Sequence, residues 1–269
     1  MSRETIPVTV ILTHYRRPYT VVKALMSLAE QTVRPANLIF IDDHSPLPEY
    51  QLFHEHAASI IPFDWHPWFY RTPFNFGLGK ARNMAVGMAN KPYVAFMDDD
   101  DTWHPEKLEL QYKAFWYTFD LSFCFTWAMR GGVKKFPAYR GEYIFDDLYL
   151  GQRINHVPAP TMMISRFWLA QAGGWGRTRH AEDFSTALRL SVVGRAYCVD
   201  KPLIYSDPDT PSLSRSRPKL YQVVDYLRAL TEGARFAVAC GHKLPVPLAV
   251  RYKQVLTNYM KGQIVRLIK

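Results

Sequence analysis

The sequence predicts an α/β protein with a Rossmann-like, mostly parallel central sheet flanked by helices. Residues 8–12 and 38–41 are short apolar runs typical of buried strands, and apolar side chains at helical spacing lie between them. A strand, a helix and a second strand in this order form a βαβ unit with parallel strands. A third apolar run, residues 93–97, ends directly in four carboxylates. Open α/β sheets bind ligands at the carboxyl ends of their strands, so these acids are expected at a binding edge.

The composition is that of a folded globular chain of 269 residues, of which 48% are hydrophobic and 21% are charged. The length suits one large domain, or one domain with an appendage. A net charge of +9 favours a negatively charged partner, which is a nucleic acid, an anionic membrane surface or an anionic substrate. No signature of a nucleic-acid-binding module accompanies the charge, so we expect no nucleic-acid partner.

The cysteines and the N-terminal residues predict a cytoplasmic protein. Cys124, Cys198 and Cys240 are widely spaced and form no metal-binding pair, which indicates reduced thiols. The first residues lack the charged-then-apolar pattern of a signal peptide. No apolar run approaches the roughly 18 residues of a membrane span.

The second strand ends in a pair of acids that begins with Asp42. Residues 68–71 are predicted to form a short strand, and a helix is predicted to follow Gly77 and Gly79. Glycines at a helix entrance permit close backbone approach, and a helix N-terminus favours an anion. The alternative is a plain loop with surface cations. Arg82 replaces the third glycine of a dinucleotide-binding motif, so this pattern does not predict a dinucleotide site.

Residues 98–101 are four consecutive aspartates. Adjacent anions repel one another unless they are solvated or share a cation. Mg²⁺ and Mn²⁺ prefer oxygen ligands, and Mg²⁺ typically takes one or two carboxylates together with substrate phosphates. The run therefore predicts a metal–diphosphate site, and a solvated acidic loop is the alternative.

The rest of the chain continues the alternation of helices and strands. The predicted elements are, in order, a helix over 105–118, strands over 121–127 and 161–165, a helix from 181, and helices from 218 onward with a break at 241–247. The helix from 181 carries Glu182 and Asp183 in its first turn. Acids at such a position commonly act only as helix-dipole partners or caps, so this pair alone does not define a site.

Taken together, the motifs resemble those of family 2 glycosyltransferases with the GT-A fold. In the family's order, the matching segments are Thr13-His-Tyr, Asp42-Asp43, Asn-x-Gly-x-x-x-Ala-Arg-Asn over 75–83, the acidic segment over 96–108, Gly173-Gly-Trp and Glu182-Asp183. They cover residues 8 to about 206. The resemblance implies a GT-A domain over 1–210, with a nucleotide-binding half over about 1–101 and an acceptor half over about 102–210. A helical C-terminal extension over 211–269 would follow.

The resemblance implies an inverting transfer of a sugar from a UDP or dTDP donor to an acceptor hydroxyl. Asp183 is the expected general base with Glu182 in reserve, because a single displacement needs only one carboxylate. A divalent ion, Mn²⁺ or Mg²⁺, is assigned to Asp100 and Asp98. The residues expected to bind the nucleotide are Thr13, Tyr15, Asp42, Lys80, Arg82, Asp98 and Asp99, and those expected on the acceptor side are Trp175 and Thr161.

Individual roles follow from the same resemblance. Asp42 would accept a hydrogen bond from N3–H of uracil or thymine, and Asp99 would lie near the ribose. Lys80 or Arg82 would stabilise the charge of the departing diphosphate. Arg215 and Arg217 are either further diphosphate contacts or surface cations.

The expected acceptor is a glycan or glycolipid, in the synthesis of a surface polysaccharide or glycolipid. The last helix is basic and amphipathic, which suits contact with an anionic leaflet at the inner face of the plasma membrane; packing on its own domain is the alternative. Two other functions stay open. One is a nucleotide-sugar-binding protein without turnover. The other is a sugar nucleotidyltransferase, although the loop over 13–18 lacks the glycines expected of that class.

Overall fold

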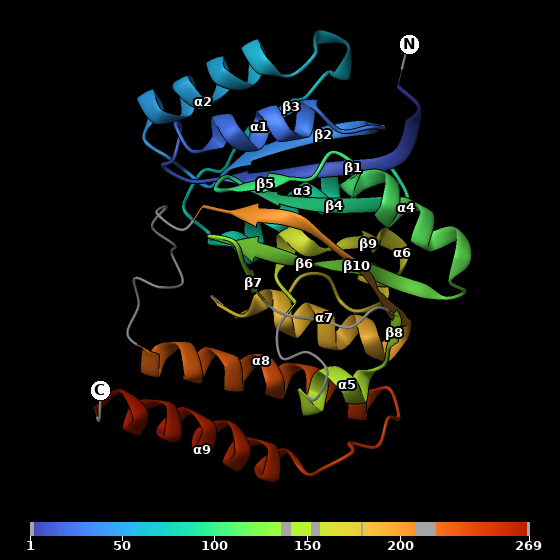
Figure 1. The fold of residues 1–269 in the computed structure, drawn as a ribbon, viewed down its shortest axis with the longest axis vertical. Coiled ribbons are helices and arrows are strands. Elements are labelled where there is room, and N and C mark those ends of the chain that lie inside the picture. The colour runs from blue at the N-terminus through green and yellow to red at the C-terminus, as the bar shows by residue number, and fades with distance from the viewer. Residues whose placement is uncertain (1–2, 136–140, 152–156, 179, 208–218, 268–269) are drawn as a thin grey trace.

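A computed structural model of the chain describes residues 3–135, 141–151, 157–178, 180–207 and 219–267. Its centre is a sheet with the strand order β3-β2-β1-β4-β9-β6-β10-β5, covered by helices on both faces (Figure 1). The first four strands in this order are parallel. They are β1 (Thr5–His14), β2 (Arg34–Asp42), β3 (Trp68–Arg71) and β4 (Tyr93–Asp98). The predicted α/β class, the βαβ unit and the short strand over 68–71 are confirmed.

The other half of the sheet is mixed in direction. Its strands are β5 (Asp101–Trp103), β6 (Leu121–Arg130), β7 (Val133–Lys135), β8 (Gly141–Tyr143), β9 (Met163–Ser165) and β10 (Arg195–Ser206). β6 and β10 are parallel, but β9 runs antiparallel to both β4 and β6 and joins the two halves. β5 is antiparallel to β10. Parallel pairing is thus concentrated in the N-terminal half, because the short strand β9 enters the sheet in the reverse direction.

Alternate side chains of the strands enter two separate cores, as the two-residue period of a strand requires. Leu38 and Phe40 pack on one face, and Ile39 and Ile41 pack on the other. The first face is covered by α1 (Val21–Ala29), α2 (Leu47–Ile60) and α4 (Lys107–Tyr117). The opposite face is covered by α3 (Leu78–Met88), α5 (Phe145–Leu150), α6 (Arg166–Gln171) and α7 (Glu182–Val193). A sheet buried on both faces explains the nearly continuous apolar runs in the sequence.

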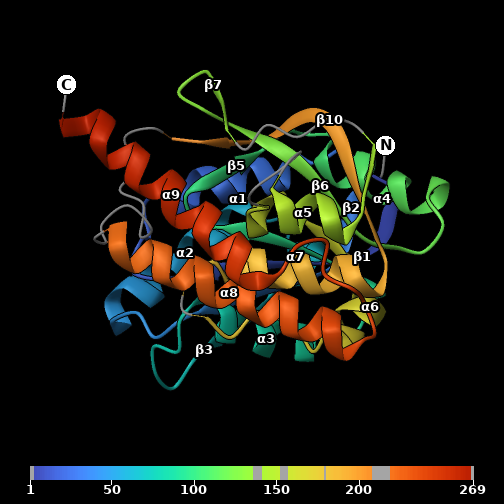
Figure 2. The ribbon, with the colours of Figure 1, turned by 90° about the horizontal axis from the view of Figure 1, so that it is seen from below.

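The C-terminal helices form an outer layer on α7 (Figures 1 and 2). They are α8 (Lys219–Ala239) and α9 (Leu248–Leu267), which confirms the predicted helices and the break between them. The ring of Tyr226 stacks on Phe184 of α7 with centroids 4.6 Å apart. A Cβ on Gly233 would lie 2.8 Å from the Leu188 side chain, so α8 and α7 are in close contact. The described part of the extension therefore shares a core with the sheet domain.

Not all basic residues of the last helix, α9, lie on the protein surface. Arg251 of α9 is buried, and its Nε donates to the backbone oxygen of Tyr149 in α5 at 2.6 Å. Arg251 therefore packs on its own protein and is not available to a membrane surface. Within the described residues, no helix is both long and apolar enough to cross a membrane.

The sequence pattern did not predict α2 and α6. Only Phe53 and Ala57 of α2 are buried, so its apolar face is too narrow to produce a clear helical period. α6 is six residues long and buries only Leu169. Neither helix carries a residue of the predicted site.

Candidate active site

The register of the sheet brings the predicted acids to one edge. Thr13 lies opposite both Ile41 of β2 and Asp98 of β4, and His14 lies opposite Asp42. The ends of three parallel strands therefore meet, as expected for a ligand-binding edge. The Thr13 hydroxyl donates to Asp98 at 3.3 Å across this edge.

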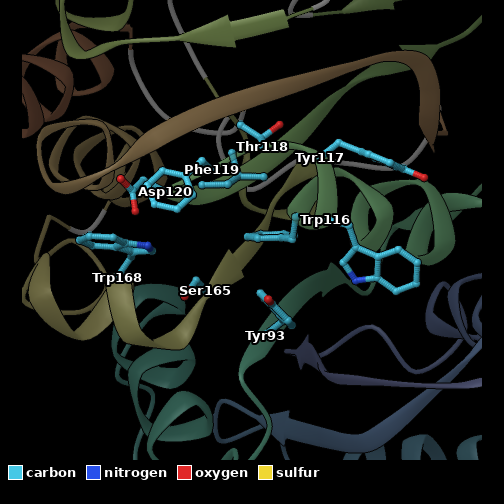
Figure 3. Close-up of a pocket in the computed structure, with 10 residues that line it drawn as sticks. Tyr93, Trp116, Tyr117, Thr118, Phe119, Asp120, Ser165 and Trp168 are labelled. Carbon is cyan, nitrogen blue, oxygen red and sulfur yellow. The ribbon is translucent and has the colours of Figure 1, made fainter.

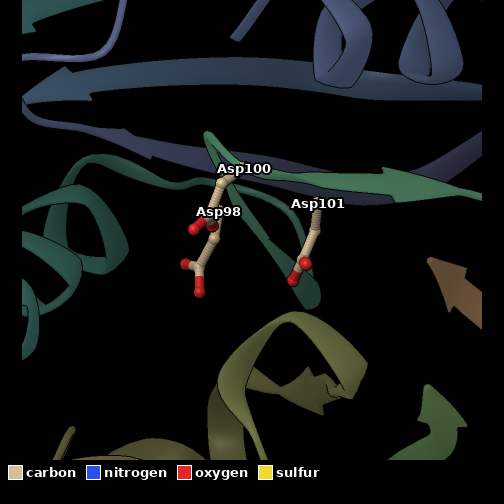
Figure 4. A group of neighbouring side chains, drawn as sticks. All are labelled: Asp98, Asp100 and Asp101. Carbon is tan, nitrogen blue, oxygen red and sulfur yellow. The ribbon is translucent and has the colours of Figure 1, made fainter. Parts of the chain in front are cut away.

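Asp98, Asp100 and Asp101 form an oxygen-only cluster just beyond β4. One carboxylate oxygen of each lies within 4.8 Å of the others, and Figure 4 shows the three side chains directed into the same space. Such a donor set fits a hard divalent ion such as Mg²⁺ or Mn²⁺. Burial, followed by the charges of Asp98 and Asp99, raises the pKa of Asp100 to about 6. Burial also raises the pKa of Asp101 well above its usual range. A positive charge beside the cluster would lower the free-energy cost of ionising these buried carboxylates.

Asp99 and Asp42 are not members of this cluster and are held by other partners. Asp99 is 6% exposed and accepts a hydrogen bond from the backbone N–H of Tyr15 at 3.2 Å, while His14 Nδ1 lies 3.1 Å from it. Asp42 is completely buried and accepts from the backbone N–H of Ser45 at 2.8 Å and from the Ser45 hydroxyl. The expected contacts of Asp99 with a ribose and of Asp42 with a base stay predictions. In this conformation both carboxylates hold the surrounding loops.

Asp43 organises the loop before α3. Its two oxygens accept hydrogen bonds from the backbone N–H groups of Phe76 and Gly77, each at 2.8 Å. Gly77 has a φ of 86°, a left-handed conformation that glycine adopts without a steric penalty. The glycine predicted from the sequence thus makes a tight turn whose backbone is fixed by an acid at the end of β2.

Arg82 joins the acidic cluster to the start of α7. Its Nη2 donates to Asp98 and its Nη1 donates to Glu182, each at 2.7 Å, and its side chain is 2% exposed. Both carboxylates neutralise the guanidinium beneath the surface, and the expected role of Arg82 at a diphosphate stays a prediction. Lys80 is exposed, with its ammonium 5.8 Å from the Phe76 ring centroid, so its expected role at a diphosphate stays a prediction.

Close contacts at glycines fix α7 against α3. A Cβ on Gly176 would lie 2.9 Å from the Glu182 Cα, and a Cβ on Gly79 would lie 2.8 Å from the Gly176 carbonyl oxygen. Ala181, which precedes α7, has a left-handed φ of 56°. Such a conformation in a residue other than glycine costs on the order of 1–3 kcal/mol and persists only where packing enforces it. The Gly173-Gly-Trp-Gly segment therefore positions the first turn of α7.

The two acids of that turn differ in their surroundings. Glu182 is buried and bound to Arg82, and burial, followed by the charge of Asp183, raises its pKa to about 7. Asp183 is partly exposed, and one of its oxygens accepts from the backbone N–H of Phe184 at 2.7 Å. Because Arg82 spans from Asp98 to Glu182, the helix start that carries Asp183 lies beside the acidic cluster. Of the two acids, Asp183 is the more exposed to solvent.

Trp175 and Thr161 are not on an exposed acceptor surface. Trp175 is 1% exposed, stacks on Phe96 with centroids 4.5 Å apart, and lies under the Arg82 guanidinium. Thr161 is also 1% exposed, and its hydroxyl donates to the Pro158 carbonyl oxygen at 2.6 Å. Both residues are corrected from acceptor contacts to core positions. Large aromatic side chains are commonly buried, which sequence position alone does not reveal.

Two further basic residues lie at this edge and were not among the site residues expected from the sequence. His14 is buried between Asp42 and Asp99, and its ring stacks on Phe53 with centroids 4.4 Å apart. Arg17 Nη1 donates to Asp100 at 2.6 Å and lies 3.3 Å from Asp99. The only signal for either was its position in the loop after the first strand. Arg215 and Arg217 lie outside the described residues.

A separate pocket of about 430 Å³ lies at the other end of β4, where Tyr93 begins the strand (Figure 3). Aromatic side chains such as Trp116 and Trp168 line most of it, together with the carboxylate of Asp120. None of the predicted site residues lines this pocket. The chemistry indicated by the sequence therefore belongs to the acidic edge and not to this pocket.

Comparison with known proteins identifies the family. The model of glycosyl transferase family 2 matches residues 9–172, which include the second half of β1, the acidic cluster and the helices between them. The chain belongs to this family. It is 23% identical over 267 residues to an uncharacterised glycosyltransferase of Haemophilus influenzae, covering 93% of this chain and 87% of that protein. It is 34% identical over 115 residues to the succinoglycan biosynthesis protein ExoW of Rhizobium meliloti, covering 39% of this chain and 33% of that protein.

The chain spans only about a third to two fifths of the length of some curated relatives that it matches. Among solved structures, it is similar to residues 1–349 of S. aureus TarS in complex with UDP-GlcNAc, with a TM-score of 0.68 and 18% identity. That similarity covers 95% of this chain and 72% of the TarS chain. The fold is the GT-A fold of glycosyltransferases, as predicted.

Proposed function

We propose that the chain is a metal-dependent, inverting glycosyltransferase that moves a sugar from a UDP or dTDP donor to a hydroxyl of a glycan or glycolipid. The observation that carries this proposal is the pairing of Arg82 with Asp98 and Glu182. It joins an oxygen-only acidic cluster to a helix start that carries a second, accessible acid. Transfer from a nucleoside diphosphate requires both features at one edge, the first for the leaving group and the second for the acceptor.

Asp98 and Asp100 would hold the divalent ion, with Asp101 as the third candidate ligand. When bound, such an ion acts as a Lewis acid that stabilises negative charge on the leaving diphosphate. Thr13 and Arg82 both donate to the same oxygen of Asp98, at 3.3 and 2.7 Å. The carboxylate is therefore oriented before the donor arrives, which lowers the reorganisation needed in the transition state.

Asp183 would take the proton of the acceptor hydroxyl. It lies in the first turn of α7, at the helix end that carries partial positive charge. Glu182, the reserve candidate, is buried and its carboxylate is bound by Arg82, which favours Asp183 as the base. A single base and a direct attack on the anomeric carbon give inversion, since no second carboxylate is needed as a nucleophile.

The names of similar proteins support the substrate class. TarS was solved with UDP-GlcNAc, and ExoW is named for succinoglycan biosynthesis. We therefore propose a UDP-sugar donor and a role in surface polysaccharide or glycolipid synthesis. A cytoplasmic location, peripheral at the inner face of the plasma membrane, stays a prediction that accompanies a glycolipid acceptor.

A thermal-shift screen of nucleotides and nucleotide sugars tests this function. With Mn²⁺ or Mg²⁺, UDP or dTDP compounds should raise the Tm, and a chelator or Asp100→Asn should abolish the effect. Glu109→Gln is the matched control and should respond like the unmodified chain, because Glu109 is a partly exposed acid in α4 that lies outside the cluster and pairs with Lys113. Stabilisation without any release of nucleoside diphosphate would indicate a binding protein. Formation of a sugar nucleotide from a sugar phosphate would indicate a nucleotidyltransferase.

A further inference from the structure

Arg17 occupies a position at the acidic cluster that the proposed reaction does not yet explain. It lies in the loop between β1 and α1, and its side chain is 18% exposed. Its Nη1 contacts Asp100 at 2.6 Å and Asp99 at 3.3 Å. Arg82 similarly covers Asp98 at 2.7 Å, so the two guanidiniums together neutralise much of the charge of the acidic run.

The contact with Asp100 places Arg17 in competition with a divalent ion. Asp100 is one of the three acids whose oxygens cluster within 4.8 Å, and a guanidinium 2.6 Å from one of its oxygens repels a divalent ion at that position. The charge of Arg82 opposes the ion less, because Arg82 is also paired with Glu182. Guanidinium groups bind phosphates as well as carboxylates, often through two parallel hydrogen bonds. An arriving diphosphate thus offers Arg17 a second anionic partner beside the first.

The backbone allows the side chain alone to move. The Arg17 carbonyl oxygen accepts from the Thr20 hydroxyl at 3.2 Å and from the Val21 backbone N–H at 3.3 Å, which ties residue 17 to the start of α1. The guanidinium extends from this fixed point on a flexible stem. A change of rotamer can transfer it from Asp100 to a ligand at the same edge without rearranging the loop.

We infer that Arg17 couples the binding of the metal to the binding of the donor diphosphate. In the donor-free protein its guanidinium takes the place of the cation at Asp100 and weakens metal binding. When the diphosphate enters, the guanidinium moves to the phosphates and releases Asp100 to the ion. Metal and nucleotide then bind cooperatively, and the acidic cluster stays neutralised in both states. This inference rests on the proposed function, because it takes a metal–diphosphate as the ligand of this edge.

The test is the Mn²⁺ affinity of the full chain, measured by titration calorimetry with and without saturating UDP. The Arg17→Gln variant should bind Mn²⁺ alone more tightly, by on the order of tenfold, and UDP should raise its affinity by a correspondingly smaller factor than in the unmodified chain. Arg16→Gln is the matched control. Arg16 carries the same charge one residue away, but its side chain is 55% exposed and pairs with Glu49. Arg17→Lys keeps the charge but lacks the planar, forked guanidinium. Its Mn²⁺ affinity should therefore lie between those of the unmodified chain and Arg17→Gln.

Two results would overturn the inference while leaving the proposed function intact. In one, Arg17→Gln and Arg16→Gln have the same Mn²⁺ affinity both with and without UDP, which would mean that only the net charge of the protein affects metal binding. In the other, Arg17→Gln folds with an unchanged Tm but binds Mn²⁺ more weakly without UDP. If the unmodified chain binds no Mn²⁺ even with UDP, the metal in the proposed function fails and the inference fails with it. The Asp100→Asn variant identifies that case, because its titration would then equal that of the unmodified chain.

Discussion

Replacing Arg82 with Met should destabilise the fold in a way that depends on pH. The Arg82 side chain is 2% exposed and makes two 2.7 Å ion pairs, one with Asp98 and one with Glu182. Met fills much of the same space but offers no charge. The Asp98 side chain is 25% exposed and can be solvated, whereas that of Glu182 is 8% exposed and cannot. Most of the cost therefore comes from Glu182.

Removal of one partner of a buried ion pair costs about 3–5 kcal/mol. The lower end applies here, because Glu182 can take up a proton. Its pKa is already raised to about 7 with Arg82 present, and loss of the guanidinium raises it further. At about pH 8 we expect a loss of about 3 kcal/mol, which corresponds to a Tm lower by about 6–12 °C. At about pH 5.5 Glu182 is protonated in both proteins, so the loss should be clearly smaller.

Urea denaturation at the two pH values measures these differences. Lys80→Met removes an exposed cation from the same helix and should change the free energy of unfolding by no more than about 0.5 kcal/mol. The double variant Arg82→Met with Glu182→Gln should recover most of the loss at about pH 8. A loss of equal size at both pH values, or a loss unaffected by Glu182→Gln, would refute the buried bridge between the acidic cluster and α7.

Two further predictions concern the start of α7. The pKa of Glu182 is raised from 4.5 to about 7 in the folded protein. Protonated Glu182 therefore makes its full contribution to the free energy of unfolding below about pH 4.5, and this contribution is lost as the pH rises through about 7. Urea titrations should therefore show a shallower decline of unfolding free energy over this range in Glu182→Gln, and equal slopes would contradict the assignment. Gly176→Ala should cost about 1–3 kcal/mol, because its Cβ would lie 2.9 Å from the Glu182 Cα. Gly87→Ala in α3 is the control, because nothing lies within 4 Å of its Cβ, and it should raise the free energy of unfolding by about 0.4–1 kcal/mol in the same assay. If Gly176→Ala left the free energy of unfolding unchanged, the close packing of α7 at this glycine would be refuted.

The acidic edge could be predicted from the sequence because each signal is local. An apolar run that stops at Asp98 marks both a strand and its carboxyl end, and parallel pairing then brings Asp42 to the same edge. The acid pair at Glu182 could be placed at a helix start for the same reason. The order of these motifs along the chain supplied the family and the fold.

The partners of these acids could not be predicted, because they depend on contacts between distant residues. Arg82 and Glu182 are 100 positions apart, and Arg17 and Asp100 are 83 positions apart. Residue type gave a misleading answer for Trp175, whose ring supports Arg82 in the core. The directions of the strands in the mixed half of the sheet could not be predicted from the sequence either, because β9 is three residues long and pairs with strands far away in the chain.

We propose that Asp183 takes the acceptor proton beside an acidic cluster that binds the donor with its metal. The most direct test is the release of nucleoside diphosphate by Asp183→Asn, with the nucleotide sugar chosen by the thermal-shift screen and with Mn²⁺ present. Loss of a general base should lower the rate by about 10²- to 10⁴-fold, while the affinity for the nucleoside diphosphate stays within about twofold. An unchanged rate, or an affinity that falls in parallel with the rate, would contradict the account.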